Sequence, residues 1–167
     1  MRTDEVVDRL VRERACLLEA VAELGDGAST VSVTEEGGWT AKDVLAHLVH
    51  YAGQIAFGLG APERPPAYVV GVSERLTGQE WNERAVAFRH DCTVDEVRSE
   101  FERITDVVIR FAGQRTDDEM NAVDAIPWAG ERPLWQIIGG DTFLDEWPAH
   151  TRQIEAAAAG NALGGTV

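Results

Sequence analysis

The chain has few cysteines, few basic residues and no long apolar run, and each shortage excludes a class of protein. Only Cys16 and Cys92 are cysteines among 167 residues, and their spacing fits no disulfide framework or metal motif. The 15 basic residues stand against 29 acidic ones, a net charge of -14 that argues against nucleic acid or an anionic membrane as partner. No apolar stretch reaches the roughly 20 residues that cross a membrane, and the N-terminus has no apolar signal core. We therefore expect a cytoplasmic protein with no nucleic-acid or membrane partner.

Length and hydrophobic content bound the architecture. A chain of 167 residues with 44% hydrophobic content can bury one core and is short for two domains. No strand-like alternation of useful length occurs, because the best candidate covers only Val31 to Val33. We expect a single domain over residues 1–160 and a flexible tail at residues 161–167.

Four long stretches carry apolar residues at intervals of three and four, which is typical of amphipathic helices. The second and third stretches have clear starts, because Thr40 with Asp43 and Thr93 with Glu96 can form capping boxes. The first predicted helix runs from a cap at Thr3 to Gly25, and the others cover about residues 41–59, 94–111 and 133–158.

Prolines divide the pattern. Three prolines at residues 60–66 end the second helix, and a shorter helix is expected at about residues 74–88, so the intervening connection forms a long crossover. Pro148 lies inside the last helix and predicts a bend at residues 144–148. Together these elements predict an all-α fold, an antiparallel four-helix bundle with a long crossover and a short accessory helix.

Two histidines and a glutamate are turned towards the predicted interior. His47 lies on the flank of the apolar stripe of the second helix, whereas His50 lies nearly opposite and is expected to meet water. Glu146 and His150, four residues apart, fall in the apolar sector of the last helix. Bundles build metal sites from inward carboxylates and imidazoles on facing helices. His47, Glu146 and His150 are therefore candidate ligands of one divalent ion, although they also permit an internal ion pair.

Other polar residues have simpler interpretations. Asp141 and Asp145 fall on the outward side of the last helix, and His90 is expected to be a solvated loop residue. Tyr51, one turn after His47, can either pack with its hydroxyl satisfied or donate to an oxygen at the ion. We assign no catalytic residue beyond the three candidate ligands and no cofactor-binding residue.

Three groups of residues carry a family pattern. They are Gly38 to Leu48, Trp81 to Val86 with Thr93 to Val97, and Glu146 to Ile154. Together they resemble the DinB-like (YfiT-like) superfamily of metal-binding four-helix bundles. The resemblance implies a triad of one histidine on the second helix and two ligands four apart on the last, which correspond to His47, Glu146 and His150. Glu146 stands where many members have histidine, as in the branch that contains mycothiol-dependent maleylpyruvate isomerase.

The resemblance implies a metal-dependent transferase or isomerase whose cosubstrate is a low-molecular-weight thiol such as mycothiol or bacillithiol. Three protein ligands would leave a position open on a zinc or nickel ion, where a bound thiol loses its proton. A non-catalytic metal- or ligand-binding stress protein and a metal-dependent hydrolase are alternatives with the same ligands. The expected partners are a small-molecule substrate and the thiol, and the surplus of tryptophan and apolar residues predicts a homodimer.

Overall fold

The protein is described by a computed structural model for residues 1–34, 38–62, 76–123, 125–126, 130–140 and 143–164, with the backbone alone for 161–164. Within these ranges the chain forms helices, a single isolated bridge between Ser32 and Thr40, and no strand. The elements are α1 (Thr3–Leu24), the 3-10 helix η1 (Gly25–Ser29), α2 (Ala41–Gly58), α3 (Gly78–Phe88), α4 (Val94–Gly113), α5 (Asp117–Asn121), α6 (Leu134–Gly139) and α7 (Glu146–Gly164). The all-α prediction is confirmed. None of the described helices is long and apolar enough to cross a membrane.

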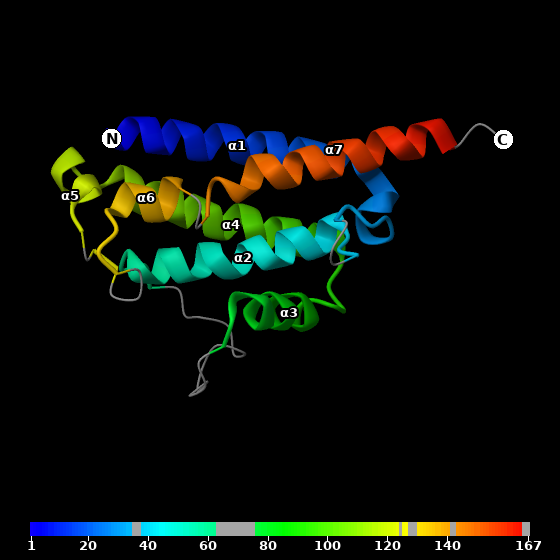
Figure 1. Cartoon of the computed structure of the whole chain (residues 1–167), viewed down its shortest axis with the longest axis horizontal. Coiled ribbons are helices and arrows are strands. Elements are labelled where there is room, and N and C mark those ends of the chain that lie inside the picture. Colours follow the sequence, from blue (N-terminus) through cyan, green and yellow to red (C-terminus); the bar gives the residue numbers. More distant parts are fainter. Residues whose placement is uncertain (35–37, 63–75, 124, 127–129, 141–142, 165–167) are drawn as a thin grey trace.

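The four long helices α1, α2, α4 and α7 extend along the longest axis of the molecule (Figure 1). α1 packs against α7 and α4, and α2 packs against α4. α1 and α7 run in one direction and α2 and α4 in the other, so the chain must return along the molecule between α2 and α4. The returning connection carries α3, which packs against α2. Most of the predicted crossover, residues 63–75, lies outside the described residues.

The start of α2 follows from its local sequence. Thr40 is the N-cap, and its side-chain oxygen accepts the backbone amide of Asp43 at 3.3 Å. The Asp43 carboxylate accepts the backbone amide of Thr40 in return at 3.0 Å, so the predicted capping box is confirmed. Because the box pairs amides that the first helical turn leaves free, it fixes where α2 begins. The rotation of every later side chain, including His47, follows from that start.

Other helix starts differ from the predictions. α1 begins at Thr3 itself, because Arg2 occupies the N-cap and its amide donates to the Glu5 carboxylate at 2.9 Å. α5 was not predicted, although Thr116 and Glu119 form the same capping box that marks α2 and α4. The acidic composition of residues 117–121 is typical of a connector between helices. The helix is five residues long, too short to show an apolar period.

The last predicted helix is two helices. α6 ends at Gly139 and α7 begins at Glu146, so the bend predicted at residues 144–148 is a break. Pro148 is the third residue of α7, a position in the first turn where its missing amide has no helical partner to lose. α7 then continues to Gly164, past the predicted end at about residue 158, so residues 161–164 of the predicted tail are helical. Residues 165–167 lie outside the described residues.

Trp147 anchors the start of α7 in the core. Its side chain is fully buried, and its ring contacts those of Phe143 and Phe101 with centroid separations of 4.8 and 5.3 Å. Edge-to-face aromatic pairs of this kind contribute about 0.5–1.5 kcal/mol each beyond the area that they bury. Because Phe101 belongs to α4, these contacts set the rotation of α7 against the rest of the molecule. The neighbouring Glu146 is thereby placed at the edge of the core.

Candidate metal centre

His47 of α2 and Glu146 and His150 of α7 converge at one point. Each residue offers one ligand atom, and these atoms all lie within 4.8 Å of one another. Nε2 of His47 is 3.0 Å from Oε2 of Glu146, and the His47 and His150 ring centroids are 5.6 Å apart. A tetrahedral ion that holds its ligands at about 2.1 Å places them about 3.4 Å apart. Two imidazoles and a carboxylate with this spacing therefore fit a single divalent ion after a small contraction, and no second such cluster occurs within the described ranges.

The three side chains span the boundary between core and solvent. His47 is 4% exposed, whereas the Glu146 side chain is 38% exposed and His150 is half-buried. The site therefore has a solvent-excluded side around His47 and a solvent-exposed side at the Glu146 carboxylate. The Glu146 carboxylate is therefore in contact with solvent.

His47 is surrounded by aromatic rings and by one side chain of α3. The rings of Trp39 and Tyr51 lie 5.4 and 5.1 Å from its ring, measured between centroids. Its Nδ1 is 2.9 Å from Oδ1 of Asn82, and the Tyr51 hydroxyl donates to the same oxygen at 3.1 Å. Tyr51 thus packs with its hydroxyl satisfied. Nothing in the spacing of the sequence linked Asn82 to His47, and the only signal was its place in a segment that carries the family pattern.

The side chain of His150 is oriented by its own helix. Nδ1 of His150 donates to the amide oxygen of Gln153 at 2.8 Å, which leaves Nε2 to act as a ligand. Burial lowers the pKa of His150; the Gln153 hydrogen bond and the Glu146 charge oppose that shift, and His47 adds to it. Burial, and then the Glu146 charge, raise the pKa of Tyr51. A lowered pKa keeps the His150 imidazole neutral near pH 7, the form that binds metals.

His50 is buried, which corrects the prediction that it meets water. The side chain is 2% exposed, its ring stacks on Trp81 of α3 at 5.4 Å, and its Nε2 accepts the side-chain amide of Gln54 at 2.5 Å. The helical wheel placed His50 opposite the bundle interior, and α3 covers that side of α2. Burial, followed by the charges of His47 and Arg89, lowers the pKa of His50 to about 4. His50 is not part of the triad.

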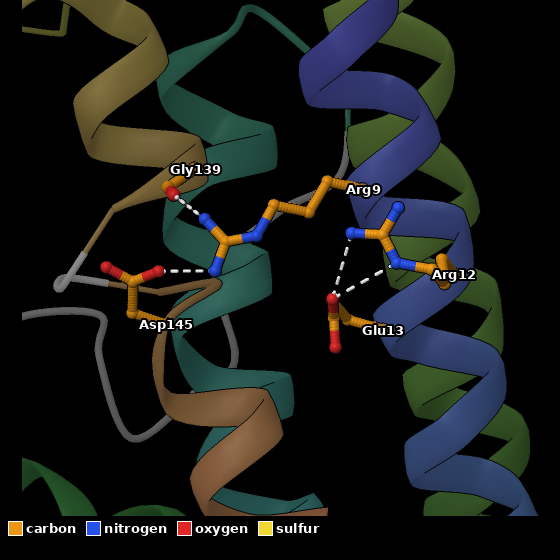
Figure 2. Close-up of polar contacts among 5 residues, drawn as sticks. All are labelled: Arg9, Arg12, Glu13, Gly139 and Asp145. Atoms are coloured by element: carbon orange, nitrogen blue, oxygen red, sulfur yellow. Dashed lines mark hydrogen bonds and ion pairs between the residues drawn. The ribbon is translucent and has the colours of Figure 1, made fainter.

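Contacts from α1 hold the connection that leads into α7. Nη1 of Arg9 donates to the carbonyl of Gly139 at 2.6 Å, and its Nη2 is 2.5 Å from Oδ1 of Asp145 (Figure 2). Asp145 is exposed, as predicted, and directly precedes Glu146. Arg9 therefore joins the end of α6 and the residue before α7 to the same point on α1.

The remaining residues singled out in the sequence lie apart from the triad. His90 is exposed, as predicted, and its ring contacts only the neighbouring Asp91 among the hydrogen bonds of the described residues. Cys16 is exposed and Cys92 is half-buried, and neither forms a disulfide. Asp141 lies outside the described residues.

Comparison with protein families places most of the chain in a known family. A family model described as the mycothiol maleylpyruvate isomerase N-terminal domain matches residues 10–155. The matched range begins inside α1 and ends inside α7, so it contains His47, Glu146 and His150. No curated protein and no solved structure matches the chain.

Proposed function

The chain belongs to the mycothiol maleylpyruvate isomerase N-terminal domain family, and from this premise we propose that it is a metal-dependent transferase or isomerase that uses a low-molecular-weight thiol of the mycothiol or bacillithiol type. The observation that carries the proposal is the convergence of His47, Glu146 and His150 at the boundary of core and solvent. Zinc or nickel suits this donor set, because borderline divalent ions accept imidazole and carboxylate together.

The residues of the site have distinct roles in this proposal. His47, Glu146 and His150 would hold the ion, and an ion held by three protein ligands lowers the pKa of a thiol or water bound beside them. Trp39 and Tyr51 line the solvent-excluded side of the site and keep water away from His47. The thiol and the small-molecule substrate would approach from the solvent-exposed side of Glu146. The Tyr51 hydroxyl already donates to Asn82, so we assign it no proton transfer.

We also propose a particular assembly of the chain. The four long helices would form one four-helix bundle domain over residues 1–160, with α3 as the accessory helix on the crossover. The homodimer and the cytoplasmic location stay predictions of the sequence. Light scattering at assay concentration tests the first of these, and a monomer mass would contradict it.

Turnover by the metal-loaded protein tests the proposed activity. The protein is loaded with zinc or nickel and assayed with mycothiol, bacillithiol or no thiol, against maleylpyruvate and a panel of electrophiles. Thiol-dependent turnover that disappears with a chelator is the expected result. Turnover that needs the metal without any thiol would identify a hydrolase, and stoichiometric metal binding without turnover would identify a non-catalytic binding protein. Either result contradicts the proposal.

A further inference from the structure

We propose that Asn82 is a positioning residue that holds His47 in the tautomer able to bind the ion, and that it thereby couples metal binding to the docking of α3 on α2. The inference rests on the metal centre of the proposed function. It adds a residue from a third helix that touches neither Glu146 nor His150 in any hydrogen bond of the described residues.

Asn82 accepts two hydrogen bonds through one oxygen. Its Oδ1 is a pure acceptor with two lone pairs, and it receives the Tyr51 hydroxyl at 3.1 Å and Nδ1–H of His47 at 2.9 Å. A neutral imidazole has one N–H, so an N–H at Nδ1 leaves a lone pair on Nε2. Nε2 is the atom that lies 3.0 Å from Glu146. Asn82 therefore selects the tautomer whose free nitrogen faces the other two ligands.

The surroundings of His47 keep its ring in one orientation. His47 is 4% exposed, so water cannot replace Asn82 as the partner of Nδ1 without entering the core. The Asn82 amide points its oxygen at both groups, and the Tyr51 hydroxyl donates to that oxygen beside His47. Outer hydrogen bonds of this kind set the ring orientation and the basicity of a ligating histidine.

Asn82 is the residue of α3 that hydrogen-bonds to the triad among the described residues. Other contacts hold α3 in place: Trp81 stacks on His50, and the buried Arg89 pairs with both carboxylate oxygens of Glu100 on α4 at 2.7 and 2.8 Å. α3 therefore stays attached when the Asn82 contact is removed. A cation on Nε2 makes Nδ1–H a stronger donor, so metal binding strengthens the contact between α2 and α3. By thermodynamic reciprocity, a docked α3 strengthens metal binding.

Two variants of Asn82 and one control separate positioning from simple packing. Asn82→Leu keeps the approximate size and removes the acceptor, whereas Asn82→Asp keeps an acceptor oxygen. Gln79→Ala is the control, because Gln79 lies on the same helix and bonds only to the exposed Glu83 among the described contacts, at 3.0 Å. The zinc dissociation constant is measured by competition with a chromophoric chelator. Circular dichroism of the metal-free proteins reports whether each variant is folded.

The expected result is a 10- to 100-fold weaker zinc affinity for Asn82→Leu, the usual effect of losing an outer hydrogen bond to a metal ligand. Asn82→Asp should bind zinc at least as tightly as the wild type, and Gln79→Ala should be unchanged. Equal zinc affinity in Asn82→Leu and the wild type would overturn the inference. Equal losses of zinc affinity in Asn82→Leu and Asn82→Asp would also overturn the inference, because changed packing alone would then explain both losses. If the wild type binds no zinc, the proposed function fails and this inference falls with it.

Hydrogen exchange tests the coupling to α3. Zinc should slow the exchange of backbone amides in residues 78–88 of the wild-type protein and leave them unchanged in Asn82→Leu at saturating zinc. Because this measurement needs neither thiol nor substrate, it does not depend on turnover. Slowing of the same size in both proteins would contradict the coupling, even if the affinities differ.

Discussion

Nε2 of His47 lies 3.0 Å from Oε2 of Glu146, although the two residues are 99 positions apart in the chain. An imidazole nitrogen and a carboxylate oxygen this close must share either a proton or a cation, because two facing lone pairs repel. Metal and proton therefore compete for the same pair of atoms.

Removal of Glu146 should separate metal binding from folding. In Glu146→Ala we expect zinc affinity to fall by about 100-fold or more, because a ligand contributes at least as much as an outer hydrogen bond. The protein should still fold, because the Glu146 side chain is 38% exposed and its removal leaves little unpaired charge in the core. Chelator competition measures the affinity and thermal unfolding the stability. Glu155→Ala, an exposed carboxylate on the same helix, is the matched control, and unchanged zinc content in Glu146→Ala would refute the ligand assignment.

Zinc affinity should fall as the pH drops through the histidine range. An imidazole binds a metal ion only in its neutral form. Protonation of the two histidines therefore displaces the ion. The lowered pKa of His150 extends its neutral form to a more acidic pH than that of an ordinary histidine. The apparent dissociation constant, measured from pH 8 to pH 5, should rise most steeply below about pH 6.5. A constant value across this interval would exclude histidine ligands.

His50 should make the metal-free protein less stable in mild acid. Its pKa is about 4 in the folded protein and about 6.5 in the unfolded chain, so between these values the unfolded chain binds the extra proton. The free energy of unfolding should therefore fall as the pH drops from about 6.5 to about 4. Between pH 7 and pH 5 the contribution of His50 is about 2 kcal/mol. Urea unfolding with a chelator present should show a shallower pH dependence in His50→Gln, and parallel curves for the two proteins would contradict the prediction.

Arg9 should support the metal centre from a distance. Arg9→Ala removes the contacts to Gly139 and Asp145, which tie the connection before Glu146 to α1 (Figure 2). The expected cost is about 1 kcal/mol in the free energy of unfolding, because the ion pair is partly exposed and screened by water. Zinc affinity should fall several-fold as the start of α7 loosens.

Arg12→Ala is the control for Arg9. Arg12 pairs with the adjacent Glu13 on the same helix and does not reach the connection (Figure 2). It should change neither the unfolding free energy nor the zinc affinity. Equal effects of the two substitutions would show that the Arg9 contacts do not matter to the site.

Two glycines of α2 should respond in opposite directions to alanine. A Cβ at Gly58 would lie 2.8 Å from Cγ2 of Ile126, a fully buried side chain, so Gly58→Ala should destabilise the protein by about 1–3 kcal/mol through overpacking. A Cβ at Gly53 meets nothing within 4 Å, so Gly53→Ala should stabilise α2 by up to about 1 kcal/mol through helix propensity. Thermal unfolding of both variants checks the pair. Stabilisation by Gly58→Ala would contradict the close packing of α2 on the segment that contains Ile126.

Much of the candidate site could be predicted from sequence because its residues depend on short-range geometry. The box between Thr40 and Asp43 sets the start of α2, and counting along the helix from there directs His47 inwards. Glu146 and His150 share a face because residues four apart are neighbours on any helix. Even the break before α7, which was predicted as a bend, does not disturb this spacing, because both residues lie after it.

Tertiary structure alone decided which faces are covered and which side chains meet across helices. His50 is buried because α3 lies on the outer side of α2, a fact that no periodicity within α2 contains. Asn82 reaches His47 for the same reason, across 35 positions of the chain. Capping boxes and helical faces are set by residues three or four apart, whose geometry the backbone hydrogen bonds dictate. Burial and contacts between helices depend on the packing of the whole chain, because any apolar or aromatic face can be covered by more than one neighbour.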